Sequence, residues 1–300
     1  MPQEPILPTS HDTSATASVL SADRDATTMK QSSSFLAGLR DDIDLDYADI
    51  PICLCSLVSG LCDSTAFNAS AVFVSMQTGN TIFLALGAAA LPRNVPLMWL
   101  KALCSILAFL LGVLFFSQTR AVRPRAKRTL AASFLAQALL IWTAAALAQG
   151  GAAPAFGSLA LAEEMQRDGV LDLRALAPIM LLAFQFGGQI VTTRLLGFNE
   201  VPTNVLTSVY CDLMSDPLLL APWRANPKRN RRASAVVLML VGGICGGWLS
   251  RTDAGMSVAL WVAGAVKFGI AVAWVSWKGE EASGGGFGES VRLPHPWLMR

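Results

Sequence analysis

The sequence predicts an all-α polytopic membrane protein, with about six transmembrane helices and two re-entrant or broken segments that enter the membrane without crossing it. Composition gives the class, because 53% of the 300 residues are hydrophobic, only 15% are charged and the mean hydropathy is +0.48. A soluble domain carries about 25% charged residues. The lengths of the apolar stretches and the basic loops between them give the number of crossings.

Two polar tails flank a membrane domain. Residues 1–40 are rich in Ser, Thr, Asp and Ala and contain no apolar run, so we expect a disordered tail. We do not expect it to be a signal peptide, because no hydrophobic core follows Met1. Residues 41–278 form the transmembrane domain, and residues 279–300, with three consecutive glycines, are expected to be a flexible C-terminal tail.

Eight apolar stretches follow one another in the membrane domain, each near the roughly 20 residues that cross a bilayer. They lie at about residues 50–67, 69–91, 97–117, 129–148, 175–196, 199–222, 233–250 and 256–277. Two connecting loops are basic and free of acids. The first contains Arg120, Arg123, Arg125, Lys127 and Arg128, and the second Arg224, Lys228, Arg229, Arg231 and Arg232. Basic loops stay in the cytoplasm, so an even number of crossings must separate them.

The stretch at 199–222 is the weakest candidate for a crossing among the three between the basic loops. It contains Glu200, Asp212, Asp216 and three prolines, and acids are costly on a helix that faces lipid. We therefore interpret it as a re-entrant or interfacial hairpin that returns to the cytoplasmic side.

The stretch at 69–91 is interrupted by Gln77, Thr78, Gly79 and Asn80 in succession. Amides and hydroxyls buried in hydrocarbon without partners cost roughly 2 to 7 kcal/mol each. This run must therefore be hydrogen-bonded inside the bundle or line a wet cavity.

The two broken stretches hold equivalent positions, second of four, in halves at about residues 50–148 and 175–277. Gly60 precedes Thr78 by 18 residues, and Gly188 precedes Thr207 by 19. Each half then has three crossings, and an odd count inverts one half relative to the other. Such an inverted 3+3 repeat, with broken segments at matching positions, indicates a transporter or channel site near the midplane. Both termini are expected in the cytosol.

The candidate substrate-binding residues are the polar residues of the broken segments and two charges near the middle of helices. They are Gln77, Thr78, Gly79, Asn80, Thr203, Asn204, Thr207, Asp63 and Lys267. We expect Asp63 and Lys267 to pair, either as a structural ion pair or as a proton-coupling site. The alternative for Gln77, Thr78 and Asn80 is that they only hold neighbouring helices together.

The seventh stretch carries two overlapping Gly-x-x-x-Gly repeats, formed by Gly242, Gly243, Gly246 and Gly247. Such repeats let helices approach closely, and the contact lies either within the chain, which we favour, or between copies in a homo-oligomer. The other expected partners are the lipid bilayer and an unknown small-molecule substrate, and no nucleic acid is expected.

We expect no cofactor, no metal and no enzymatic activity. The only histidines, His11 and His295, lie in the tails, and the cysteines form no Cys-x-x-Cys pair. The sequence contains no Gly-x-Ser-x-Gly elbow, no His-Glu-x-x-His helix and no Walker-type phosphate loop. Neither hydrolysis nor ATP-driven pumping is therefore indicated.

Several runs resemble the YoaK-like family of polytopic membrane proteins, a family of unknown function. They are Gly60-Leu61-Cys62-Asp63, the run from Val72 to Asn80, Phe184 to Gln189 and Asn199 to Thr203. The runs at 206–213 and 241–251 are similar to its filamentous-fungal branch. The resemblance covers about residues 41–278 and implies six membrane spans in a fungal membrane protein. The chain departs from the family at Thr207-Ser208-Val209, where bacterial members have a Thr-Gly-polar pattern.

The favoured function is therefore a small-molecule transporter or channel with a midplane site formed by the broken polar segments. The alternative is a non-transporting membrane scaffold or accessory protein that serves a metabolite pathway. An intramembrane enzyme is the least favoured class.

Overall fold

The computed structural model describes residues 37–92, 95, 97–170, 172–252 and 255–279. Within these residues the regular structure is helical, apart from two isolated β-bridges. The predicted tails, residues 1–40 and 279–300, lie almost wholly outside the described residues.

Six helices are long and apolar enough to cross a membrane, which confirms the predicted number. They are α2 (Asp49–Ser70), α4 (Met98–Ser117, continued by the 3-10 helix η1, Gln118–Val122), α5 (Lys127–Gln149), α7 (Leu176–Leu196), α9 (Pro227–Ser250) and α10 (Ser257–Val275). The shorter elements are α3 (Gln77–Gly87), η2 (Pro154–Phe156), α6 (Leu159–Arg167), α8 (Thr207–Met214) and η3 (Trp223–Ala225).

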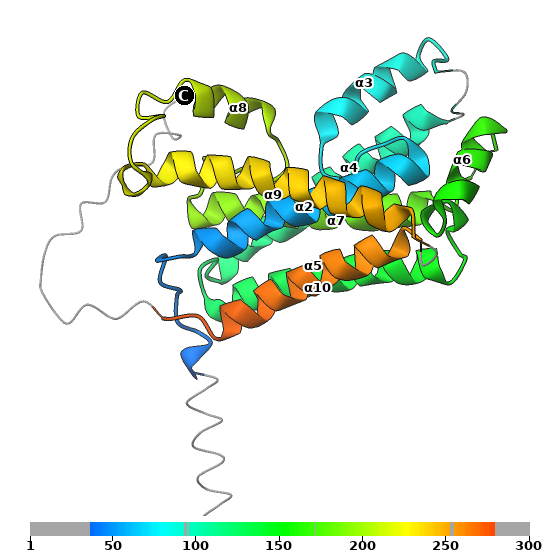
Figure 1. Ribbon diagram of the computed structural model, residues 1–300. Coiled ribbons are helices and arrows are strands. Elements are labelled where there is room, and N and C mark those ends of the chain that lie inside the picture. The colour runs from blue at the N-terminus through cyan, green and yellow to red at the C-terminus, as the bar shows by residue number, and fades with distance from the viewer. Residues whose placement is uncertain (1–36, 93–94, 96, 171, 253–254, 280–300) are drawn as a thin grey trace, which may run out of the picture.

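The spans form a bundle around two central helices. Consecutive spans run in opposite directions, and α2 and α7 are the most deeply buried of the six (Figure 1). The main packing partners are α2 with α9, α4 with α7, and α5 with α10. The outer spans α4 and α9 expose large apolar side chains such as Leu111, Leu114 and Leu240, as expected for surfaces that face lipid.

Both basic loops lie at the same end of the bundle. Ile43 donates its N–H to the carbonyl of Arg125 at 3.0 Å, which places the chain before α2 beside the α4–α5 turn. Arg231, in the second turn of α9, forms an ion pair with Asp49 at 2.8 Å. This end is called the basic end below. The arrangement agrees with an even number of crossings between the two loops.

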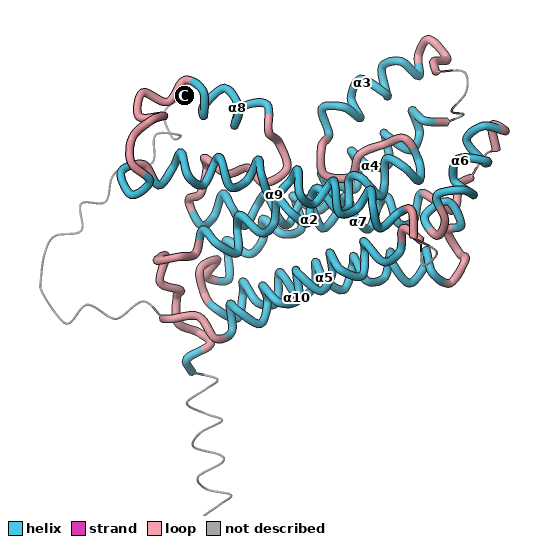
Figure 2. The backbone as a smooth tube through the Cα atoms, in the orientation of Figure 1, coloured by secondary structure: helices cyan, strands magenta, loops and turns pink. Residues whose placement is uncertain are grey.

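Two segments enter the bundle and leave again on the side from which they came. The first arm, residues 71–91, turns at the middle of α2 and then continues as α3. The second arm, residues 198–222, starts at the basic end, reaches the middle of α7 and returns as α8. The arms diverge on one side of the bundle, and Figure 2 shows in pink the loops that lead into them. Neither short helix is long enough to span, in agreement with the prediction that these two segments do not cross.

Glycines allow a close helix contact between α2 and α9. A Cβ atom on Gly242 would overlap the carbonyl oxygen of Leu57, and one on Gly246 would overlap the Ser64 hydroxyl. Added Cβ atoms on Gly243 and Gly247 would meet nothing within 4 Å. One Gly-x-x-x-Gly pair therefore packs within the chain, and the other faces open space.

A second glycine contact joins α4 and α7 in the same manner. A Cβ atom on Gly112 would overlap the carbonyl oxygen of Phe184, and one on Gly187 would lie 2.6 Å from the carbonyl oxygen of Phe109. Both pairs of helices are thus in contact backbone to backbone, without intervening side chains.

Gly242→Ala is expected to destabilise the protein by about 1–3 kcal/mol, because the added methyl group overpacks the contact with Leu57. Thermal unfolding of the purified protein in detergent measures this effect. Gly247→Ala makes the same chemical change in open space and should leave the unfolding temperature unchanged. Equal unfolding temperatures for both variants would contradict the internal helix contact.

Candidate functional site

Asp63 holds the turn of the first arm. Its carboxylate lies in the middle of α2, where the residue is only 5% exposed. Oδ1 accepts the N–H groups of Val74 at 2.9 Å and Ser75 at 2.8 Å, and Oδ2 accepts the Ser75 hydroxyl. Backbone groups that leave a helix at membrane depth need such partners. Asp63 thus stabilises the point at which the chain reverses.

Asn80 holds the same turn from the other side. Its Nδ2 donates to the Phe73 carbonyl at 2.7 Å, while its Oδ1 accepts the Phe73 N–H at 3.0 Å. The Ser105 hydroxyl of α4 donates to the same carbonyl at 2.8 Å, and Gln77 Nε2 donates to the Val74 carbonyl at 3.0 Å. Asn80 is fully buried. The amides of Gln77 and Asn80 therefore satisfy the backbone of their own segment.

The other two residues of the polar run lie differently. Thr78 is exposed at the start of α3. An added Cβ atom on Gly79 would lie 3.0 Å from the Phe73 ring, so glycine lets that ring pack against the helix.

The second arm is held by a glutamine of α7. Gln189 Nε2 lies 2.8 Å from Asn204 Oδ1, 3.0 Å from Thr203 Oγ1 and 2.9 Å from Ser59 Oγ of α2. Asn204 Nδ2 also donates to the Phe186 carbonyl at 3.3 Å. Thr203 and Asn204 therefore hold the second turn in the middle of the bundle.

Gln189 is one of the residues of these contacts that the sequence does not single out, as are Ser105 and Gln137. Its signal is an amide inside a mainly apolar helix, within the run from Phe184 to Gln189. Gln185, one turn earlier, is also fully buried, and neither of its amide atoms has a hydrogen-bond partner among the described residues.

The expected ion pair between Asp63 and Lys267 does not form. Lys267 Nζ lies 2.7 Å from Gln137 Oε1, 3.8 Å from Cys55 Sγ and 4.9 Å from the centre of the Phe134 ring. The α2 residue that meets Lys267 is thus Cys55, which precedes Asp63 by eight positions, or about 12 Å along a helix. Asp63 instead faces the first arm. The two charges therefore lie at different levels along α2 and have different partners.

A cavity of about 640 Å³ lies between the two arms. Its wall includes Asp63 of α2, Phe73 and Met76 from the first arm, Thr207 and Tyr210 from the second, and Gly243 of α9. Asp63 is the one charged residue among the described residues that line it. Ligand pockets commonly have volumes of about 300–1,000 Å³.

The cavity wall includes two of the predicted site residues, Asp63 and Thr207. The side chain of Asn80 is committed to the turn next to the cavity, Asn204 to the turn of the second arm, and Lys267 to the contact between α10 and α5. Among the described residues, no group of three His, Cys, Asp or Glu side chains could hold a metal ion.

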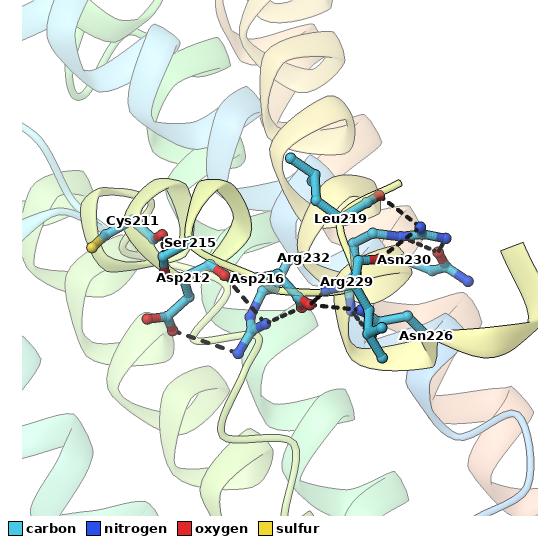
Figure 3. Close-up of polar contacts among 10 residues, drawn as sticks. Cys211, Asp212, Ser215, Asp216, Leu219, Asn226, Arg229, Asn230 and Arg232 are labelled. Carbon is cyan, nitrogen blue, oxygen red and sulfur yellow. Dashed lines mark hydrogen bonds and ion pairs between the residues drawn. The ribbon is translucent and has the colours of Figure 1, made fainter. Parts of the chain in front are cut away.

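A polar cluster fixes the return loop of the second arm to α9 (Figure 3). Arg232 lies 3.3 Å from Asp216 and 3.7 Å from Asp212, and Asn226 Nδ2 donates to Asp216 at 3.0 Å. Hydrogen bonds from Asn226 and from the Leu218 N–H, together with nearby Arg232, lower the pKa of the Asp216 carboxyl. These contacts lie at the basic end, away from the cavity between the arms.

The six apolar spans and the two re-entrant arms define a multi-pass integral membrane protein. The chain belongs to the family described as "Protein of unknown function (DUF1275)", whose model matches residues 52–273. Comparisons with curated proteins and with solved structures found no match.

Asn80→Ala should lower the free energy of unfolding by about 1–3 kcal/mol, because it leaves both polar groups of Phe73 without their amide partner. Thr78→Ala, two residues away, removes an exposed hydroxyl and should have no measurable effect. Unfolding of both variants in detergent measures the difference. If Thr78→Ala were the more damaging change, the assignment of Asn80 to the turn would be wrong.

Asp63→Asn and Lys267→Met should destabilise the protein additively, because the two side chains share no partner. A double-mutant cycle of unfolding free energies should give a coupling energy below about 0.5 kcal/mol. Partial rescue in the double variant would instead show that the charges interact.

Proposed function

We propose that this protein is a small-molecule transporter or channel, with its substrate site in the cavity between the two arms. The observation that carries the proposal is that both re-entrant arms contribute to one cavity of about 640 Å³ beside Asp63, in the middle of a span. Segments that break at membrane depth are tolerated where they line such a cavity. Transporters commonly bind their substrates at this depth.

The starts of α3 and α8 support a wet or ligand-filled cavity. Neither helix has a side-chain cap at its first turn, so backbone N–H groups there lack that partner. Thr207 and Ser208 are exposed beside these groups. Lipid tails offer no hydrogen bonds, whereas water or a polar solute does.

We further propose that the two halves form an inverted repeat. The first half contains the spans α2, α4 and α5, and the second half contains α7, α9 and α10. Taken in chain order, each span of the first half runs in the direction opposite to its counterpart in the second half (Figure 1). Each half has its short helix after its first span. Repeats of this kind allow one half to rock against the other around a fixed site.

The glycine contacts support this repeat residue by residue. Leu57 and Gly60 have the same spacing as Phe184 and Gly187, and each pair meets a glycine of an outer span at its partner helix. These contacts make Gly187 the counterpart of Gly60. The sequence spacing to Thr78 and Thr207 instead suggested Gly188, which is one position later. On this alignment Asp63 has no acidic counterpart in α7, so the half-sites are not equivalent.

The orientation that we propose places the basic end in the cytosol. The isolated bridge between Ile43 and Gly279 brings both ends of the described chain to that end. The YoaK-like identity and a filamentous-fungal source rest on the sequence runs alone.

Flux through the reconstituted protein tests the function. Gly243 lines the cavity, so Gly243→Leu places a leucine side chain in its open space. Gly247→Leu makes the same change one turn away, at a position that does not line the cavity. Liposomes that contain each protein are loaded with a panel of labelled metabolites. We expect Gly243→Leu to reduce flux about tenfold or more, which corresponds to about 1.4 kcal/mol, and Gly247→Leu to leave it unchanged.

Equal flux through both glycine variants would exclude this cavity as the transport site. A well-folded protein that moves no solute of the panel would favour the scaffold role.

A further inference from the structure

The cavity between the arms opens toward the lipid-facing side of α9. Leu240 and Ile244 line it and are 62% and 51% exposed, and Tyr210 on the opposite wall is 51% exposed. Neighbouring positions of α9, including Val237 and Val241, are also exposed apolar side chains. A solute can therefore reach the cavity from the bilayer, and the apolar wall favours a lipophilic one.

The charge of the cavity wall is negative. Asp63 is its only charged side chain, and no Lys, Arg or His is present among the described lining residues. Lys267, the nearest candidate on sequence grounds, is committed to Gln137 in a different part of the bundle. A carboxylate that is buried away from any cation is costly, and a cationic ligand would offset that cost.

Asp63 also retains room for a ligand. A carboxylate has about four acceptor positions. Oδ1 accepts two N–H groups, from Val74 and Ser75, whereas Oδ2 accepts only the Ser75 hydroxyl. One position on Oδ2 is therefore left for a donor such as an ammonium group.

Aromatic rings share the cavity wall with this acid. Phe67 and Phe73 both line the cavity and stack on each other, with ring centres 5.2 Å apart. Tyr210 lines it from the second arm. The faces of aromatic rings attract cations, most strongly where water is excluded.

We propose that the cavity binds a lipophilic organic cation, an amine whose ammonium group approaches the free position on Asp63 and whose apolar body packs against Phe67, Phe73 and Tyr210. This substrate class rests on the proposed function, since it concerns the same site. The competing influence is the partial positive charge at the starts of α3 and α8, which would favour an anion.

Three solutes that differ only in their polar group separate these cases: phenylbutylamine, phenylbutanol and phenylbutyrate. Binding to the purified full-length protein is measured by equilibrium dialysis at neutral pH. We expect the amine to bind about tenfold more tightly than the alcohol, and the carboxylate more weakly than both. Equal affinities, or tightest binding of the carboxylate, would overturn the proposal.

Asp63→Asn should remove the preference for the amine over the alcohol, so that the ratio of the two affinities falls to about one. The matched control is Asp168→Asn, an exposed acid outside the cavity, which should retain the preference. If Asp63→Asn does not fold, Gly243→Leu against Gly247→Leu tests the same site, and only the first should weaken amine binding about tenfold. A preference for the amine that survives the Asp63 or Gly243 change would overturn the proposal.

The binding experiment tests the substrate class and the flux experiment tests the transport function, so each proposal can fail without the other. Tight, Asp63-dependent amine binding without flux of any solute would contradict transport but support the substrate class. Flux of other solutes without amine binding would leave transport standing and exclude the organic cation.

Discussion

A backbone that turns inside a bilayer must find its hydrogen-bond partners within the protein, and a small set of polar side chains holds the two turns of this bundle. Asp63 and Asn80 supply the partners for the turn of the first arm, and Gln189 holds Thr203 and Asn204 at the turn of the second. The residues that look most costly in an apolar chain are thus the ones that allow the chain to reverse at membrane depth. A cavity lined by both arms follows from these two reversals.

Close helix contacts make room for the arms. Where Gly242 meets Leu57, and Gly112 meets Phe184, backbones touch without side chains between them. The central helices are therefore held by backbone-to-backbone contacts, α2 with α9 and α7 with α4. One side of the bundle stays free for α3 and α8. The ion pairs of Arg231 and Arg232 then hold the second arm and the start of α9 together at the basic end. Packing fixes the middle of the molecule, and charges fix its polar end.

The sequence predicts well how deep a residue lies in the membrane, but it predicts poorly toward which neighbouring helix a side chain points. The lengths of the apolar stretches and the positions of the basic loops were enough to predict six spans. The acids near Asp212 were enough to predict that the second arm does not cross. Asp63 and Lys267 were correctly placed deep in the bundle, yet they point to different neighbours, because depth follows from counting residues and direction depends on which helices pack together. The sequence shows Gln189 only as an amide inside α7, because its partners Thr203 and Asn204 come from another segment.

Lys267 has a consequence for how the protein is made. It lies in the last span and has no ion pair within the described part of the chain, and its closest polar partner is Gln137 of α5. A lysine at the centre of a helix costs about 2.5–3.5 kcal/mol during insertion by the translocon. Because α5 is synthesised earlier, its amide is already in the membrane when α10 emerges. We therefore expect insertion of α10 to be coupled to its docking on α5, where Gln137 accepts a hydrogen bond from the Lys267 ammonium group.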